Sequence, residues 1–114
     1  MDNTDFPTHV APYVVAKVAT LEEAMIQIEE NAHRSVVVVD GRKVVGVLSD
    51  GDLRKAILDK RLLSTPVSEV MNVSFASVTP DTLEHAKDLF AKPYILLVPV
   101  VDSNLQLVDI LTAY

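Results

Sequence analysis

The 114-residue chain contains no cysteine and no tryptophan. The lack of cysteine excludes disulfides and thiolate metal sites. Basic residues are also scarce, because ten Lys and Arg face sixteen Asp and Glu, for a net charge of −6. This charge disfavours broad binding to nucleic acid or to an anionic membrane. The start, MDNTDF, lacks a secretory signal pattern, and no apolar run is long enough for a membrane span. We therefore expect a cytoplasmic protein with no nucleic-acid or membrane partner.

What the sequence does contain is an internal repeat. Residues 20–28 (TLEEAMIQI) match 82–90 (TLEHAKDLF), and residues 36–40 (VVVVD) match 98–102 (VPVVD), both at an offset of 62. The segments that follow, VVGVLS at 44–49 and LVDILT at 107–112, are offset by 63. One residue has therefore entered the second turn, where an insertion costs little. We predict two copies of one unit, 1–64 with an N-terminal tail and 65–114.

Each copy has the same predicted order of elements. Extended pieces at 14–18 and 75–78 precede helices, which are followed by strands at 36–39 and 44–48 and at 95–101 and 107–111. The strands are continuous apolar runs, which are typical of strands covered on both faces. A last helix is predicted over 50–60, with no counterpart in the second copy before Tyr114. The predicted fold class is α/β (α+β), built of tandem β-α-β-β-α repeats.

The helix starts and stripes are predicted from local spacing. Thr20 and Glu23 have the spacing of a capping box, and in the second copy Pro80 and Asp81 are expected to open the helix, with Glu84 three residues after Asp81. Apolar residues recur at helical spacing. The predicted stripes are Leu21, Ala24, Met25 and Ile28; Leu53, Ala56 and Ile57; and Leu83, Ala86, Leu89 and Phe90.

Two further segments have a predicted placement. The stretch KRLLSTPVSEVMN, residues 60–72, is expected to be an ordered connector. Within it Thr65 caps a short turn that starts with Pro66, and Val67, Val70 and Met71 dock on the body. Pro99 cannot donate a hydrogen bond to a sheet, so we expect it at a strand edge or at the start of a strand.

The segment Gly46–Asp52 reads G-h-h-[ST]-x-x-D, where h is apolar, and it follows the last strand of the first copy. Together with the duplication and the connector PVSEVMN, it resembles the CBS domain pair, also called the Bateman module. The stretch SDGDLRKAIL is similar to pairs fused ahead of sugar-phosphate nucleotidyltransferases or behind sugar-phosphate isomerases. The end at LVDILTAY favours the nucleotidyltransferase association.

The resemblance implies a regulatory module whose two units pack about a pseudo-two-fold axis and leave two clefts. Such clefts bind AMP, ADP, ATP or S-adenosylmethionine, and two pairs often form a flat dimer. Carried to this sequence, Ser49 meets phosphate or ribose and Asp52 meets ribose hydroxyls. In the second copy Thr112 keeps the hydroxyl, but Asp109 replaces the motif glycine. The further ligand-site candidates are Gly46, Arg54, Leu97 and Val98.

The residues themselves leave other interpretations open. Ser49, Asp50 and Asp52 can cap the following helix, Gly46 can relieve packing, Arg54 can be a solvated surface charge like Lys55, and Leu97 and Val98 can be plain core. A divalent metal at the two aspartates lacks a further acid nearby in sequence. His9, His33 and His85 lack the paired spacing of a zinc site.

Three functions are compatible with this sequence. The preferred one is a non-catalytic module that binds an adenine nucleotide, signals to a fused or partner enzyme and forms a homodimer. The second is a structural dimerisation module with no functional ligand site. The third, a small nucleotide-handling enzyme, requires a base or a metal cluster, and no such constellation is present in the sequence.

Overall fold

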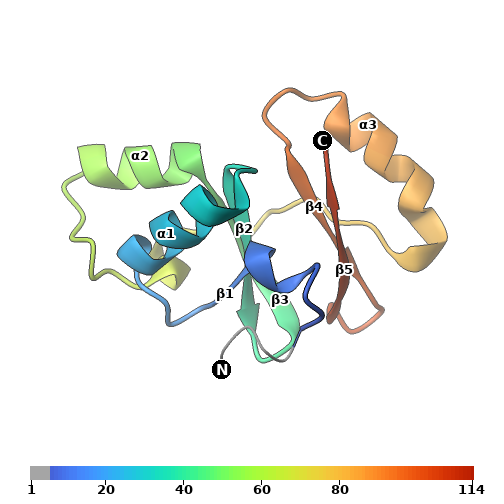
Figure 1. Cartoon of the computed structure of the whole chain (residues 1–114), viewed down its shortest axis with the longest axis horizontal. Helices are drawn as coiled ribbons and strands as arrows, with labels where there is room; N and C mark the ends of the chain where they lie inside the picture. The colour runs from blue at the N-terminus through green and yellow to red at the C-terminus, as the bar shows by residue number, and fades with distance from the viewer. Residues whose placement is uncertain (1–5) are drawn as a thin grey trace.

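The computed structural model describes residues 6–114, so the first five residues of the predicted tail lie outside it. Two sets of elements lie side by side, the N-terminal set in blue and green and the C-terminal set in orange and red (Figure 1). The elements in chain order are the 3₁₀ turn η2 (Ala11–Tyr13), β1 (Val14–Ala16), α1 (Leu21–Asn31), β2 (Ser35–Asp40), β3 (Lys43–Ser49), α2 (Asp50–Leu58), the 3₁₀ turns η3 (Val67–Glu69) and η4 (Pro80–His85), α3 (Ala86–Phe90), β4 (Leu97–Val101) and β5 (Leu107–Thr112).

The strands of the described residues form two small sheets. β1 runs parallel to β2, and β2 runs antiparallel to β3. β4 and β5 form a separate antiparallel pair. Helices α1 and α2 lie beside the first sheet, and η4 and α3 lie beside the second (Figure 1). The α/β fold class predicted from the sequence is confirmed.

The duplication is visible in the strand register. Val39 of β2 pairs with Val44 of β3, and Val101 of β4 pairs with Leu107 of β5. These positions differ by 62 on the first strand and by 63 on the second, as in the sequence. In both hairpins the register shifts immediately before this pair. The extra residue of the second copy therefore lies in its hairpin turn, as predicted.

The two hairpins also bond to each other. The backbone N–H of Val44 donates to the carbonyl of Leu105 at 2.9 Å, and the N–H of Leu107 donates to the carbonyl of Arg42 at 2.8 Å. Residues 42 and 105, like 44 and 107, are equivalent positions of the repeat. Interchanging the two copies of the repeat therefore converts one hydrogen bond into the other. This is the pattern expected when two units are related by a pseudo-two-fold axis.

Strand β2 is buried on both faces. Val36 and Val38 belong to a core with residues of α1 and α2, whereas Val37 and Val39 belong to a core with residues of β4 and β5. All four side chains are at most 1% exposed. Burial of a valine side chain contributes about 1.5 kcal/mol or more. The continuous run VVVV thus joins the two halves, and the prediction of strands covered on both faces is confirmed for β2.

The capping box of α1 is present as predicted. The Thr20 hydroxyl accepts from the N–H of Glu23 at 3.1 Å, and the Glu23 carboxylate accepts from the N–H of Thr20 at 3.3 Å. Leu21, Ala24 and Ile28 of the stripe are buried, but Met25 is 36% exposed. Ile57 of the α2 stripe is likewise 47% exposed. The apolar stripe of each helix is wider than the surface that the sheet covers. Met25 and Ile57 therefore remain partly exposed.

The second-copy helix begins at Pro80, as predicted, but its capping contacts and the geometry of its first turn differ from those expected. Thr79, and not Asp81, is the residue before the helical turn, and its N–H donates to the Thr82 hydroxyl at 2.9 Å. The first segment is a 3₁₀ turn with a kink at Thr82, and Leu83 is 46% exposed. Three residues per turn rotate Leu83 off the face that an α-helix would bury. No helix in residues 6–114 is long and apolar enough to cross a membrane.

The expected strand at 75–78 is reduced to a single parallel bridge between Val78 and Val100. The N–H of Val78 donates to the carbonyl of Pro99 at 3.1 Å. Pro99 has no N–H to continue this pairing. The prediction that Pro99 occupies a strand edge is therefore confirmed, although it lies in the middle of β4 and not at its start.

The connector is ordered and docks on the first half. Pro66, and not Thr65, precedes the turn η3, and no side chain caps that turn. Val67 is fully buried, and Met71 packs against the α1–α2 core. Gly46 makes room for this contact, because a Cβ atom there would lie 2.6 Å from the Met71 sulfur. The hypothesis that Gly46 relieves packing is confirmed.

We predict that Gly46→Ala lowers the free energy of unfolding by about 1–3 kcal/mol through overpacking against Met71. The measurement is urea denaturation of the wild type, Gly46→Ala, Met71→Ala and the double variant. The loss of stability caused by Gly46→Ala should be smaller in the Met71→Ala background than in the wild type. An equal cost in both backgrounds would show that Met71 is not the obstacle.

Candidate functional site

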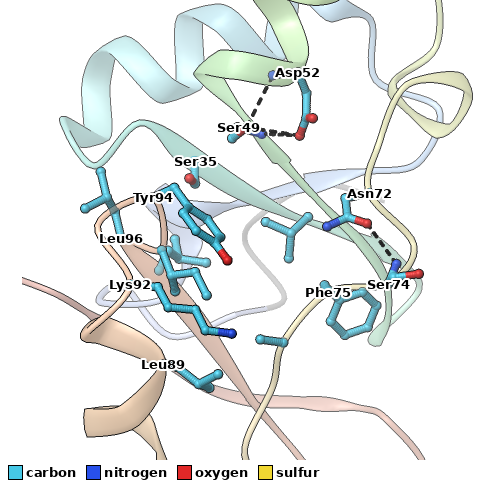
Figure 2. A pocket seen from close by; sticks show the side chains of 14 residues that line it. Ser35, Ser49, Asp52, Asn72, Ser74, Phe75, Leu89, Lys92, Tyr94 and Leu96 are labelled. Atoms are coloured by element: carbon cyan, nitrogen blue, oxygen red, sulfur yellow. Dashed lines mark hydrogen bonds between the residues drawn. The ribbon is translucent and has the colours of Figure 1, made fainter.

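A cavity of about 460 Å³ lies between the two halves of the molecule. Its walls come from the junction of β3 and α2, from the connector after η3, and from the loop between α3 and β4 (Figure 2). Its size is within the usual range of small-molecule sites. The lining residues are Ser35, Val47, Ser49, Asp52, Asn72, Ser74, Phe75, Ala76, Leu89, Lys92, Tyr94, Ile95, Leu96 and Leu97.

Ser49 and Asp52 cap α2 at one end of the cavity (Figure 2). The Ser49 hydroxyl is bonded to the N–H of Asp52 at 3.3 Å, and Asp52 Oδ2 accepts from the N–H of Ser49 at 2.9 Å and from its hydroxyl at 3.1 Å. Asp50 takes no part in this capping box, although it begins the helix. The helix-cap interpretation is thus correct for Ser49 and Asp52.

The cap leaves one carboxylate oxygen of Asp52 available. Within residues 6–114 every hydrogen bond to this carboxylate goes to Oδ2. The Asp52 side chain is only half-buried and lines the cavity. An ionised carboxylate accepts hydrogen bonds through both oxygens. Oδ1 can therefore accept from a hydroxyl group of a ligand while Oδ2 holds the helix end.

The connector supplies a second wall. The N–H of Asn72 donates to the carbonyl of Val47 at 2.8 Å, and the N–H of Val47 donates back at 3.0 Å. The Asn72 side chain accepts from the N–H of Ser74 at 2.9 Å, which bends the chain toward the cavity. This brings Phe75 to the cavity wall, opposite Tyr94 in the view of Figure 2.

The loop after α3 forms the third wall. Leu97 is buried at the start of β4, whereas Tyr94 is 74% exposed and its hydroxyl points toward the middle of the cavity (Figure 2). Lys92 lies at the end of the cavity opposite Asp52 (Figure 2). The cavity therefore has a carboxylate at one end and an ammonium group at the other, with both apolar and polar side chains in the rest of its lining.

The structure brings together three of the seven residues predicted for the site: Ser49, Asp52 and Leu97. Gly46 lies beneath Met71. Arg54 lines a different surface hollow, which it shares with Met25 and Ile57. Neither residue lines the cavity, because Gly46 is covered by the connector and Arg54 is two positions from Asp52 and faces another side of the helix.

The remaining two candidates also lie outside this cavity. Val98 is fully buried in a core with Val78, Ala86 and Val100, so it corresponds to the plain-core interpretation. Thr112 ends β5, in the other half of the repeat, and its hydroxyl donates to the carbonyl of Tyr114 at 3.0 Å. The structure therefore places Thr112 apart from Ser49, its repeat equivalent.

Three ring side chains, those of Tyr13, His33 and Tyr114, contact one another near the end of β5. The His33 ring stacks on Tyr114 with a centroid distance of 4.7 Å and meets Tyr13 edge-on at 5.4 Å. His33 Nε2 lies 2.6 Å from the carbonyl oxygen of Tyr114, and the Tyr114 hydroxyl donates to the carbonyl of Ala32 at 3.3 Å. At the repeat offset of 62, Tyr13 and His33 correspond to Phe75 and Ile95, which line the Ser49–Asp52 cavity.

The described residues do not form a metal centre. Nowhere in residues 6–114 do three or more His, Asp or Glu side chains gather in a way that could hold a metal ion. His33 contacts tyrosines and backbone carbonyls, and His9 pairs with Asp109 at 3.2 Å on the surface. Asp52, one of the two carboxylates considered for a metal, is engaged with Ser49.

Sequence reasoning did not identify Phe75, Lys92 or Tyr94 as site residues. The sequence predicts an extended piece at 75–78 that includes Phe75, and Lys92 and Tyr94 belong to the loop KPY before β4. The available signal was Pro93, because a proline flanked by a lysine and a tyrosine indicates a fixed turn that can present both side chains. Which side of the molecule this turn faces depends on how the halves pack, and local sequence does not specify that.

Comparison with known proteins gives a family match and relatives. The sequence model of the CBS domain matches residues 4–59 and 67–114. Arabinose 5-phosphate isomerase GutQ of Escherichia coli K12 is 35% identical over 92 residues. That match covers 79% of this chain and 29% of the isomerase, so this chain spans less than a third of that relative. This relative is an isomerase, so the match does not support the predicted association with a nucleotidyltransferase.

Solved structures show the same architecture. CBSX2 in complex with AMP has a TM-score of 0.73 and 28% identity, and the match covers 97% of this chain and 89% of CBSX2. The CBS domain pair of protein MJ0100, in complex with 5′-methylthioadenosine and S-adenosyl-L-methionine, has a TM-score of 0.73. It is 24% identical, with 90% of this chain and 82% of that chain covered, and it supports the fold alone.

We predict that Asp52→Ala lowers the free energy of unfolding by about 1 kcal/mol in the absence of any ligand, because α2 loses its capping box. Asp52→Glu should retain most of the stability, since Thr20 and Glu23 make the same type of box on α1. Urea denaturation of both variants measures the change in the free energy of unfolding. Glu23→Ala, which removes the equivalent box on α1, is the comparison. Wild-type stability in Asp52→Ala would contradict a structural role for the contact.

Proposed function

Because the chain belongs to the CBS domain family, we propose that its cavity binds an adenine nucleotide or another adenosyl ligand and that occupancy regulates an attached or associated enzyme. As a CBS pair the chain is a regulatory module and not a catalyst. The observation that carries the proposal is the Asp52 side chain, which lines the cavity while Ser49 engages only one of its two carboxylate oxygens.

The cavity suits the parts of an adenosine. Asp52 Oδ1 is an acceptor for ribose hydroxyls, and charge-assisted bonds of this kind are stronger than neutral ones. Phe75, Tyr94 and Leu97 offer aromatic and apolar surface to an adenine ring. The AMP complex of CBSX2, at 28% identity over nearly the whole chain, supports AMP as a ligand class. S-adenosylmethionine is the second candidate.

We propose a sugar-phosphate isomerase as the type of enzyme under control, in a cytoplasmic setting. The support is the 35% identity with part of the arabinose 5-phosphate isomerase GutQ, of which this chain covers 29%. The nucleotidyltransferase association suggested by the sequence is the weaker alternative, because the relative compared above is an isomerase. The boundary between the two motifs, placed between residues 64 and 65, stays a prediction.

The first test is a thermal-shift screen with AMP, ADP, ATP and S-adenosylmethionine, followed by calorimetry of any compound that stabilises the protein. At a hundred times the dissociation constant, a ligand specific for the folded state adds about 2.7 kcal/mol. Asp52→Asn keeps a side-chain oxygen for the cap but removes the charge, so we expect at least tenfold weaker binding.

Glu23→Gln is the matched control, since it alters the same kind of cap on α1, which does not line the cavity. It should bind like the wild type. If none of the four compounds shifts the melting temperature, the ligand proposal is wrong, and the purely structural dimerisation module becomes the preferred interpretation.

Both interpretations include a homodimer through the outer face of α1 and α2. Met25, Ile26, Ile57 and Leu63 on or beside these helices are between 36% and 55% exposed, although isolated soluble domains rarely present such clusters. Identical chains most often associate about a two-fold axis, which pairs the same patch on both copies. A second copy is therefore the proposed occupant of this face.

We expect light scattering after gel filtration to give twice the chain mass of 12.5 kDa. Ile26→Lys should shift the mass to that of one chain, because a charge would be buried in the interface. Val108→Lys is the control, since Val108 is 46% exposed but lies on β5. A monomeric wild type, or dissociation by the control alone, would contradict the proposed interface.

A further inference from the structure

Helix α1 has a second stripe of residues, which faces away from the core. Its members recur at helical spacing, and together with Leu63 they line one surface hollow: Glu22, Met25, Ile26, Glu29 and Glu30. The three glutamates are exposed, and the sequence of α1, LEEAMIQIEEN, contains no Lys or Arg. The outer face of α1 therefore combines apolar side chains with carboxylates and has no cation of its own.

Helix α2 lies beside α1 and presents a cation to the same face (Figure 1). Arg54 and Ile57 of α2 line a hollow together with Met25 and Glu29 of α1. Both α2 residues are exposed, whereas Asp50, the α2 acid that lines this hollow, is half-buried at the start of the helix. The two helices thus share one partly apolar face, which is acidic on α1 and carries an exposed base on α2.

The charges of this face are not paired within one copy. None of the ion pairs formed among residues 6–114 includes Arg54, Glu29 or another glutamate of the outer stripe. Arg54 and Glu29 line the same hollow, but their charged groups are not within ion-pair distance. The guanidinium group of Arg54 is therefore available to a carboxylate of another molecule.

A second copy can cover this face in two ways, because two helices lie side by side on it. A two-fold axis that runs across the helices places α1 on α1 and α2 on α2 of the second copy. A two-fold axis that runs along the helices places α1 of each copy on α2 of the other. Both arrangements pair the same patch, as two-fold symmetry requires, but they bring different charges together.

The charges favour the arrangement of α1 on α2. Packing of α1 on α1 would bring the glutamates of both copies together without a cation, and like charges across an interface oppose association. A two-fold axis along the helices instead brings α2 onto α1 without shifting it along their length. Arg54 then meets Glu29 of the second copy, because the two residues already lie at the same level of the shared hollow. Ile57 meets Met25 in the same way.

Building on the homodimer of the proposed function, we propose that α1 of each copy packs on α2 of the other and that Arg54 selects this arrangement by pairing with Glu29 of the second copy. The symmetry makes each such contact occur twice in a dimer. Arginine beside apolar residues is common among the residues that dominate binding at interfaces. Helix α2 thus lines the cavity through Asp52 and carries the assembly contact through Arg54.

The test is the dissociation constant of the dimer from sedimentation equilibrium. We expect Arg54→Ala to weaken the dimer about fivefold to tenfold, because two exposed ion pairs are lost per dimer. Arg54→Glu and Glu29→Arg should each weaken it further, since each creates a repulsion between like charges. The double variant with both reversals should associate nearly as tightly as the wild type, because the same pair forms with its charges exchanged.

Lys55→Glu is the matched control. It makes the same change of charge on the same helix, but Lys55 lines a hollow on the other side of α2, together with Asp59 and Arg61. Its dimer should dissociate like that of the wild type. Urea denaturation of every variant verifies that the fold is retained, because all of the altered side chains are exposed.

The sign of the Arg54→Ala effect separates the two arrangements. A tighter dimer would mean that Arg54 faces its own counterpart, as it does when α2 packs on α2, and would overturn the proposal. An unchanged dissociation constant in Arg54→Glu overturns the arrangement and leaves the homodimer standing. A change confined to the free energy of unfolding assigns the Arg54–Glu29 pair to one chain, which also overturns it. A monomeric wild type overturns the homodimer and this inference together, whereas ligand binding is measured independently by calorimetry.

Discussion

The structure depends on β2 being buried on both of its faces. Val36 and Val38 are covered by the helices of the first half, while Val37 and Val39 are covered by the strands of the second half. Without the second half, two valines that are at most 1% exposed would face water. The cavity exists only in this packed arrangement, because Asp52 comes from one half and Lys92 from the other. The same contact that stabilises the fold therefore assembles the site.

Asp52 shows why a capping role and a binding role are compatible. Its carboxylate has two oxygens, and the cap occupies Oδ2 with both the N–H and the hydroxyl of Ser49. A side chain held at the end of a helix loses little further conformational entropy when a ligand binds. The cap thus fixes the position of the carboxylate, and the contact proposed for Oδ1 with a ligand hydroxyl is compatible with it.

Much of the fold was predictable because its signals are local or repeated. The Thr20–Glu23 box, the hairpin after Asp40 and the inserted residue of the second turn follow from spacing in the sequence. The first turn of the second-copy helix was not predicted correctly. Leu83 is exposed because its turn is 3₁₀ and not α, and Thr79 replaces Asp81 before that turn.

The site was predictable only on the side that carries a motif. Ser49 and Asp52 lie in a contiguous segment that ends a strand, so sequence places them together. Lys92 and Tyr94 lie some forty residues away along the chain. No pattern in KPYIL specifies which side of the molecule this turn faces. That position follows from the valines of β2 and from the bonds between the two hairpins.

The two copies therefore share a backbone and differ in chemistry. Their hairpins have the same register shift and exchange equivalent hydrogen bonds. At one junction Ser49 and Asp52 line an open cavity, whereas at the other Thr112 bonds to Tyr114, whose ring stacks on His33. Strand pairing can preserve the backbone of both copies while the side chains that follow the last strand of each copy differ. Symmetry of the fold is therefore no argument for two equal binding sites in this chain.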